Sequence, residues 1–168
     1  MRRNLIVAWF AALALAAGAS GCGSGGDDPE GTQGTEGPVP VRVIQSGKGG
    51  RFATITLYKG SAQPKIVPAD KPPLQKVLIR DLRIGKGKVA HGGDKLILFY
   101  DSAAYKGGKR LYFRWPPQHP LVHRLADEPW EKALIGMKVG GQREVIVPSH
   151  LLFKSGTVDY IFELKGVD

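Results

Sequence analysis

The sequence predicts an α+β domain in which a curved antiparallel β-sheet of about five strands packs against one short helix. Two observations support this prediction. Short segments rich in β-branched and aromatic residues recur through the second half of the chain, with turn-forming residues between them. One segment instead spaces its apolar residues by three, four and seven positions, which is typical of a helix.

The strands are expected where apolar runs are bounded by glycine or proline. Glycine pairs at 92–93 and 107–108 each precede such a run, and Pro116 and Pro148 each follow one. Because short turns separate the runs, neighbouring strands should be antiparallel. The expected strands cover residues 77–84, 95–100, 110–115, 142–147 and 158–164.

The helix is expected to begin just before residue 130. Its apolar stripe consists of Trp130, Ala133, Leu134 and Met137. Asp127 is a candidate N-cap, and Pro129 suits the first turn of a helix. The glycines at 140–141 should end the segment.

An N-terminal extension at 39–71 precedes the main domain. Valines alternate at its start, and residues 52–58 are rich in β-branched and aromatic residues, so we predict a hairpin here. Four prolines lie between residues 62 and 73. They predict either a second linker or an extended segment wrapped on the domain.

Residues 1–21 have the pattern of a lipoprotein signal peptide. Two arginines precede an uncharged apolar run, and small residues lead to Cys22, the only cysteine. The segment Ala-Ser-Gly-Cys resembles a bacterial lipobox, whose cysteine is lipidated and becomes the mature N-terminus. The alternative is a plain secretory signal. We expect a lipid-anchored, extracytoplasmic protein of the cell envelope.

Residues 22–38 follow as a flexible tether. After Cys22 they read GSGGDDPEGTQGTEGP, a composition that cannot build a core. A random coil of this length reaches about 20–24 Å. The predicted order is therefore a signal peptide, a tether, the extension and a folded domain at 72–168.

Charge and cysteine usage exclude several classes of function. The chain has 24 Lys and Arg against 15 Asp and Glu, but its basic residues are scattered and form no nucleic-acid motif. One cysteine excludes an internal disulfide framework and a cysteine-rich zinc site. His119 and His123 are four positions apart, but neighbouring prolines argue against a helix. We expect a monomer without a metal site or a nucleic-acid partner.

Four motifs occur in order along residues 72–168. They read DLRIGKG at 81–87, GDKLILFY at 93–100, WEKALIGMKVGGQR at 130–143 and VP at 147–148. Together they resemble the FKBP-type peptidyl-prolyl cis-trans isomerases. The resemblance implies the FKBP-like fold and activity on Xaa-Pro bonds in unfolded or exported proteins.

The resemblance also implies an aromatic pocket. Trp130 matches the family's pocket floor, Tyr100 an aromatic wall, and Tyr160 a pocket phenylalanine on the last strand. Phe153 stands where the family has a tyrosine whose hydroxyl donates to the ligand, and phenylalanine has no such donor. Leu121 is our candidate for a further wall position.

Other matched positions depart from the family pattern. Leu111 stands in place of a pocket phenylalanine, and Tyr112 in place of the pocket aspartate. Asp127 falls on an aliphatic position whose backbone amide binds the substrate carbonyl. The loop that overhangs the cleft is cut to residues 154–156. These changes predict a diverged pocket that is more open to water.

The expected chemistry needs no nucleophile, cofactor or acid–base pair. Rotation about a peptide bond faces a barrier of about 18–20 kcal/mol, and twisting removes its resonance charge separation. A water-poor aromatic cavity therefore binds the twisted form better than the planar form. Two functions remain open, because a fold does not determine activity. They are an envelope prolyl isomerase and an FKBP-like peptide-binding or chaperone module with little or no catalysis.

Overall fold

The computed structural model describes residues 38–168 apart from 47–49, 73 and 153–155. These residues fall within one compact unit, Glu36–Asp168. The predicted signal peptide, Cys22, the tether before residue 38 and Phe153 lie outside the described residues. In the described part of the chain, no helix is long and apolar enough to cross a membrane.

Six antiparallel strands form the main sheet. They are β4 (Leu78–Arg83), β5 (Lys95–Ala104), β6 (Arg110–Arg114), β7 (Leu121–Arg124), β8 (Gln142–Val147) and β9 (Val158–Val167). The order is β4-β8-β9-β5-β6, and β7 also pairs with β5. The α+β class is confirmed, and each expected strand is present. The sequence pattern missed β7, because this four-residue strand follows the prolines at 116, 117 and 120.

The helix is shorter than its apolar spacing predicts. α1 spans only Pro129–Lys132, and its N-cap is Glu128, so the expected N-cap at Asp127 is wrong. Beyond Lys132 the chain bonds to a distant segment: Gly136 N–H donates to the Ala90 carbonyl at 2.9 Å, and Ala90 N–H donates to the Met137 carbonyl at 2.8 Å. Tertiary hydrogen bonds therefore replace the helical pattern after one turn.

The predicted apolar stripe is nevertheless buried. Ala133, Leu134 and Met137 pack into a core on the α1 side of the main sheet. The other buried members of this core are Ala90, Leu96, Leu98, Leu125, Val145, Val147, Phe162 and Leu164. The 3-4-7 spacing thus identified the inward-facing residues but not the backbone conformation beyond the first turn.

Gly85 allows the turn after β4 to pack tightly on residues 138–141. A Cβ at this position would lie 2.3 Å from the Lys138 carbonyl oxygen and 2.4 Å from that of Val139. No side chain fits at such distances. The glycine at 85 is therefore required by a close approach between two backbone segments.

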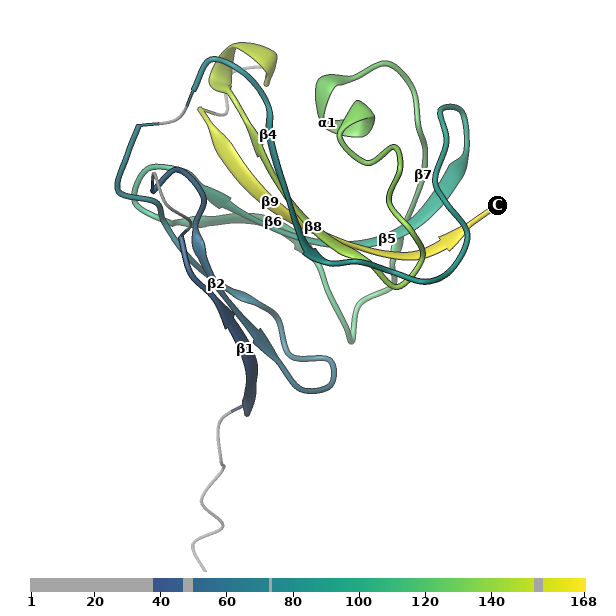
Figure 1. The fold of residues 1–168 in the computed structure, drawn as a ribbon, viewed down its shortest axis with the longest axis horizontal. Coiled ribbons are helices and arrows are strands. Elements are labelled where there is room, and N and C mark those ends of the chain that lie inside the picture. Colours follow the sequence, from purple (N-terminus) through teal and green to yellow (C-terminus); the bar gives the residue numbers. More distant parts are fainter. Residues whose placement is uncertain (1–37, 47–49, 73, 153–155) are drawn as a thin grey trace, which may run out of the picture. The chain divides into compact units, whose positions relative to one another are not determined.

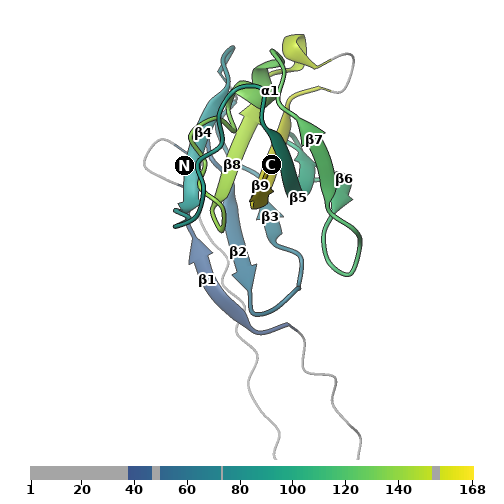
Figure 2. The ribbon, with the colours of Figure 1, turned by 90° about the vertical axis from the view of Figure 1, so that its right-hand side faces the viewer.

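The N-terminal extension forms a separate small sheet. Its strands are β1 (Pro40–Ile44), β2 (Thr54–Tyr58) and β3 (Lys65–Val67), paired antiparallel in that order (Figure 2). β1 and β2 form a hairpin-like pair, and the proline-containing segment that we expected to be a linker or an extended wrap contributes β3.

The small sheet covers the face of the main sheet opposite α1 (Figure 1). A second core lies between the two sheets and contains Ala53, Ile55, Leu82, Trp115 and Ile161. The main sheet is therefore covered on both faces. This double coverage explains why β8 is buried at all but one of its positions.

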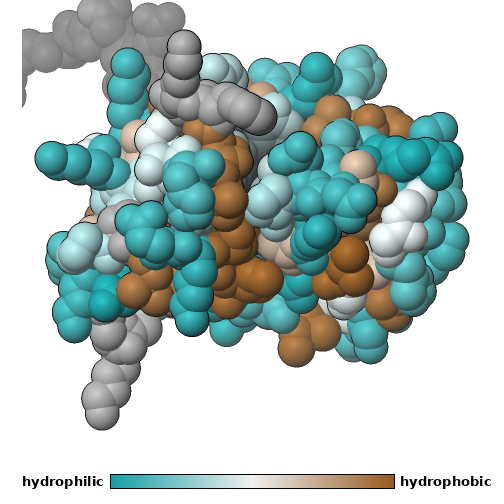
Figure 3. Space-filling view, turned by 90° about the horizontal axis from the view of Figure 1, so that it is seen from above, coloured by the Kyte–Doolittle hydropathy of each residue, from teal (hydrophilic) through white to brown (hydrophobic). Residues whose placement is uncertain are grey.

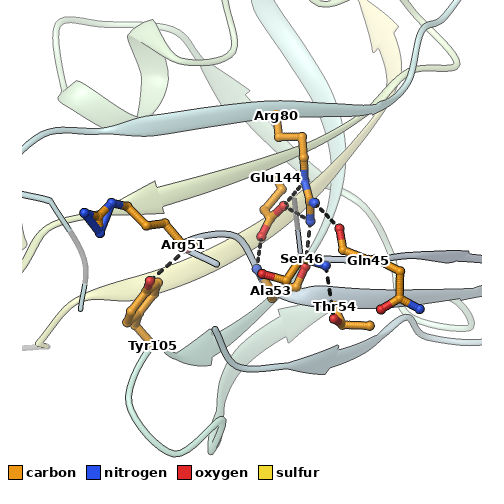
Figure 4. Close-up of polar contacts among 8 residues, drawn as sticks. All are labelled: Gln45, Ser46, Arg51, Ala53, Thr54, Arg80, Tyr105 and Glu144. Carbon is orange, nitrogen blue, oxygen red and sulfur yellow. Dashed lines mark hydrogen bonds and ion pairs between the residues drawn. The ribbon is translucent and has the colours of Figure 1, made fainter. Parts of the chain in front are cut away.

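A buried ion pair between β4 and β8 of the main sheet, Arg80 with Glu144, makes hydrogen bonds to the backbone of the extension (Figure 4). Glu144 of β8 accepts a hydrogen bond from Ala53 N–H at 2.9 Å and from Arg80 Nε at 2.7 Å. Arg80 also donates to the carbonyls of Gln45 at 2.8 Å and Ala53 at 2.7 Å. The Glu144 carboxylate is fully buried, so these bonds replace the water that it has lost.

Candidate active site

An aromatic cavity of about 230 Å³ opens on the α1 side of the main sheet. Six side chains line it: Tyr100, Tyr112, Leu121, Trp130, Tyr160 and Phe162. Figure 3 looks down on this end of the molecule and shows a band of apolar surface between hydrophilic surfaces. Among the described residues that line the aromatic cavity, none is acidic or basic.

Phe162 is the centre of the aromatic group. Its ring is stacked near-parallel to Trp130, with centroids 5.8 Å apart and an interplanar angle of 11°. It is likewise stacked on Tyr160 at 5.4 Å and 15°. Tyr100 lies 6.3 Å away and is tilted by 40°. These separations are those of interacting aromatic pairs.

Strand alternation positions three of these rings. Tyr160 and Phe162 are two residues apart on β9, so both point to the α1 side of the sheet. Tyr100 of β5 is the register partner of Phe162. Directly paired side chains on adjacent strands lie close enough to interact. The sheet thus places these three rings together without any loop.

Trp130 is held by the capping region of α1. The buried Glu131 carboxylate accepts hydrogen bonds from the backbone N–H groups of Ala126 at 2.7 Å and Glu128 at 3.2 Å. Its other oxygen lies 2.5 Å from His123 Nε2 on β7. The His123 ring also lies 5.0 Å from the Trp130 ring. These contacts fix the turn that carries Trp130 against β7.

The Tyr160 phenol remains a hydrogen-bond donor at neutral pH. Burial raises the pKa of Tyr160, and the neighbouring Tyr100 and Tyr112 raise it further. A protonated phenol can donate to a carbonyl oxygen in the cavity. The site therefore combines apolar ring surfaces with a neutral donor.

The structure brings together four of the predicted site residues. Tyr100, Tyr112, Trp130 and Tyr160 all line the aromatic cavity, as does Leu121, the candidate wall position. Trp130 is partly buried and packs against the main core, at the start of α1 as expected.

Leu111 and Asp127 lie outside the cavity lining. Leu111 precedes Tyr112 on β6, so strand alternation turns it to the opposite face. The Asp127 side chain is fully exposed and lies 3.5 Å from Lys132 Nζ. Phe153 and Cys22 are outside the described residues, so their roles stay predictions.

Phe162 is the cavity residue that the sequence analysis missed. The signal was present, because Phe162 follows Tyr160 by two positions on a strand, and one face of that strand was already assigned to the pocket. Its ring is 2% exposed and lies beneath the others.

Comparison with known proteins identifies the family. No family model matches the chain. An FK506-binding protein of Streptomyces anulatus is 33% identical over 90 residues, which are 51% of this chain and 72% of that protein. The chain belongs to the FK506-binding protein family. The resemblance carried by the four motifs is thus confirmed at the level of the family.

A further relative and two solved structures are also similar to parts of the chain. A probable FK506-binding protein of Corynebacterium glutamicum is 28% identical over 90 residues, covering 51% of this chain and 75% of that protein. The crystal structure of FkpA from Escherichia coli has a TM-score of 0.49 and 23% identity, covering 55% of this chain and 48% of that chain. A putative peptidyl prolyl cis-trans isomerase FKBP12 from Mycobacterium tuberculosis has a TM-score of 0.45 and 25% identity, covering 58% of this chain and 88% of that chain.

Proposed function

We propose that this protein is a peptidyl-prolyl cis-trans isomerase that acts on Xaa-Pro segments of exported proteins and assists their folding. The observation that carries the proposal is the aromatic cavity, in which Trp130, Tyr160 and Tyr100 surround Phe162. Membership of the FK506-binding protein family supports the same activity.

The cavity suits a reaction driven by desolvation. An Xaa-Pro bond has a cis population that makes its isomerisation useful to a folding chain. A planar imide has a charge separation that water stabilises, and the twisted imide has lost it. A cavity lined by rings and without charged side chains removes that water, so it favours the twisted form.

We expect the turnover to be weak. Tyr112 lines the cavity although it is 66% exposed, so its ring lies at the cavity mouth and narrows it. A narrowed mouth restricts the entry of the peptide chain, and this lowers turnover. We also expect a preference for an apolar residue before the proline, because the cavity walls are rings and leucine.

A protease-coupled isomerisation assay on short Xaa-Pro peptides tests this proposal. Trp130→Leu removes a stacked ring from the lining and should reduce kcat/KM by at least about tenfold, equivalent to about 1.4 kcal/mol of barrier. Phe113→Leu is the matched control, because Phe113 lies on β6 outside the cavity lining and should keep the wild-type rate. Equal rates for both variants would contradict the assignment of the site.

The second candidate is an FKBP-like peptide-binding or chaperone module with little or no catalysis. Tyr112 favours this function, because an aromatic ring stands where the family resemblance places a carboxylate. A wild-type chain that binds a proline-containing peptide at the aromatic cavity, without accelerating its isomerisation, would establish this function in place of the first.

We further propose that the protein works at the cell envelope, anchored through a lipidated Cys22. The sequence before residue 38 supports this, since the apolar run ends at the only cysteine and a glycine-rich tether follows. Cys22→Ser should release the protein from the membrane fraction, because a lipoprotein loses its acyl chains with that sulfur. An unchanged membrane fraction in the Cys22→Ser strain would refute the anchor.

A further inference from the structure

A larger cavity of about 400 Å³ lies between the two sheets, on the side of the main sheet opposite the aromatic cavity. We call it the inter-sheet cavity. Figure 1 shows β1 and β2 diverging from the main sheet in this region. Trp115, a member of the second core, and Leu57 of β2, which packs against that core, provide apolar lining. Nothing in the isomerase proposal uses this space.

The charged side chains of the inter-sheet cavity are mainly basic. Arg42, Lys59 and Arg83 line it, and Glu163 is the one acidic residue among the described lining residues. The Glu163 carboxylate is already paired with Arg83 at 3.3 Å and with Lys165 at 3.2 Å. The excess positive charge therefore favours an anionic ligand.

Gln142 provides a hydrogen-bond acceptor in the same lining. This residue is 6% exposed, and its Nε2 donates to Glu163 at 3.1 Å. Its Oε1 is buried and has no hydrogen-bond partner within the described residues. A buried acceptor is normally satisfied, so a ligand that offers an N–H group would complete the site.

From these features we propose that the inter-sheet cavity binds an N-acylated amino-acid carboxylate with a large apolar side chain. Such a group occurs at the C-terminus of a peptide and in a free N-acyl amino acid. Lys59 and Arg42 hold the carboxylate, and its apolar side chain packs against Leu57 and Trp115. The amide N–H donates to Gln142 Oε1.

The first test titrates the full ¹⁵N-labelled chain with N-acetyl-leucine and follows the Trp115 indole and the Gln142 side-chain amide by NMR. Three probes each remove one feature of the ligand. N-acetyl-leucine amide lacks the charge, N-acetyl-N-methyl-leucine lacks the N–H, and N-acetylglycine lacks the apolar side chain. Each should bind at least about fivefold more weakly, with the largest loss for the amide, because charge-assisted hydrogen bonds are the strongest of these contacts.

Protein variants provide the second test. Lys59→Gln should weaken N-acetyl-leucine binding by at least about threefold, and raising the salt concentration should reduce this difference. Arg114→Gln is the matched control, since Arg114 is an exposed arginine of β6 outside this lining. Lys59 is exposed and is not a member of the second core, so its substitution should leave the fold intact.

A longer probe distinguishes the two sources of the ligand. Tighter binding of N-acetyl-Ala-Ala-Leu than of N-acetyl-leucine would assign the site to peptide C-termini, and equal binding would assign it to free N-acyl amino acids. Three results would overturn the proposal: no shift at Trp115, equal affinity for the acid and its amide, or shifts confined to Tyr100 and Tyr160 in the aromatic cavity.

Discussion

Tyr112 has an unusual position for an aromatic side chain, since it lines the aromatic cavity while most of its surface faces water. Its backbone is fixed by Ser102: the Tyr112 N–H lies 3.1 Å from Ser102 Oγ, and that hydroxyl lies 2.7 Å from the Tyr112 carbonyl oxygen. The ring therefore starts from a fixed point on β6 and narrows the mouth of the cavity.

We predict that Tyr112→Asp raises turnover. The substitution removes the ring from the cavity mouth and restores the carboxylate that the family resemblance places here. An increase in kcat/KM of about tenfold would correspond to about 1.4 kcal/mol of barrier. The measurement is the protease-coupled assay. Leu111→Phe serves as the control, because Leu111 lies outside the lining and should leave the rate unchanged.

If Tyr112→Asp left the chain inactive while the wild type still bound proline peptides, the peptide-binding function would be favoured. A wild type as active as a well-formed relative would show instead that Tyr112 does not restrict the cavity.

At the scale of elements, α1 is a single turn, and it contributes to packing mainly through Trp130. The ring is stacked on Phe162 and contacts the main core. We predict that Trp130→Ala lowers the free energy of unfolding by about 3 kcal/mol, near the low end for a large aromatic, because the ring is only partly buried. Urea titration measures this. A loss below about 1 kcal/mol would mean that Trp130 contributes little packing.

The packing of the small sheet on the main sheet depends on Arg80. Its guanidinium bonds to Glu144 and to two carbonyls of the N-terminal extension, and it lies 4.8 Å from the Phe52 ring centroid. Removing it leaves the buried Glu144 carboxylate without its positive partner, with the Ala53 N–H and the Asp159 carboxyl as its remaining partners. The extension is thus joined to the main domain by a buried charge pair as well as by the second core.

We predict that Arg80→Met lowers the free energy of unfolding by at least about 3 kcal/mol, since breaking a buried pair leaves an uncompensated charge. Arg83→Met is the matched control. Its pair with Glu163 is much more exposed, so the loss should stay below about 1 kcal/mol. If both variants lost the same unfolding free energy in denaturant titration, the Arg80 contacts would contribute no more than an exposed ion pair.

At the scale of the whole molecule, the interface between the sheets contains a second buried carboxyl. Asp159 of β9 is 2% exposed and hydrogen-bonds to Glu144. Burial raises the pKa of Asp159 well above its usual value, and the charge of Glu144 raises it further. Burial also raises the pKa of Glu144, although Arg80 opposes this. Asp159 therefore keeps its proton to a higher pH than an exposed aspartate does.

This proton makes stability depend on pH. The folded pKa of Asp159 lies above the unfolded pKa of about 4, so the folded state binds the proton more tightly. The stabilisation is fully present below the unfolded pKa and is lost as the pH rises through the folded pKa. We predict that unfolding free energy falls toward alkaline pH, and that Asp159→Asn, which is neutral at every pH, reduces this slope.

Urea titrations from acidic to alkaline pH measure the slope. Asp70→Asn is the control, because Asp70 is exposed and its replacement should keep the wild-type slope. An Asp159→Asn protein with the wild-type pH dependence would show that Asp159 does not hold the proton.

The sequence by itself determined every strand of the main sheet except β7, the inward-facing residues around Trp130 and the family. Strand positions follow from local alternation and turn residues, which do not depend on distant contacts. The four motifs were specific because they occur in order. The resemblance carried by these motifs implied that Tyr100, Tyr160 and Trp130 line one pocket, and all three line the aromatic cavity.

Only the tertiary structure decided the length of α1, the role of Phe162 and the place of the extension. Hydrogen bonds between Ala90 and residues Gly136 and Met137 replace the helix after one turn. No local sequence pattern predicts these bonds. Phe162 became the centre of the site because β5 and β9 pair in one register. The extension covers the main sheet because Glu144, buried on that face, bonds to Ala53, which is 91 residues away. Contacts of this kind depend on which distant surfaces pack together in the folded chain. Local sequence patterns do not specify that.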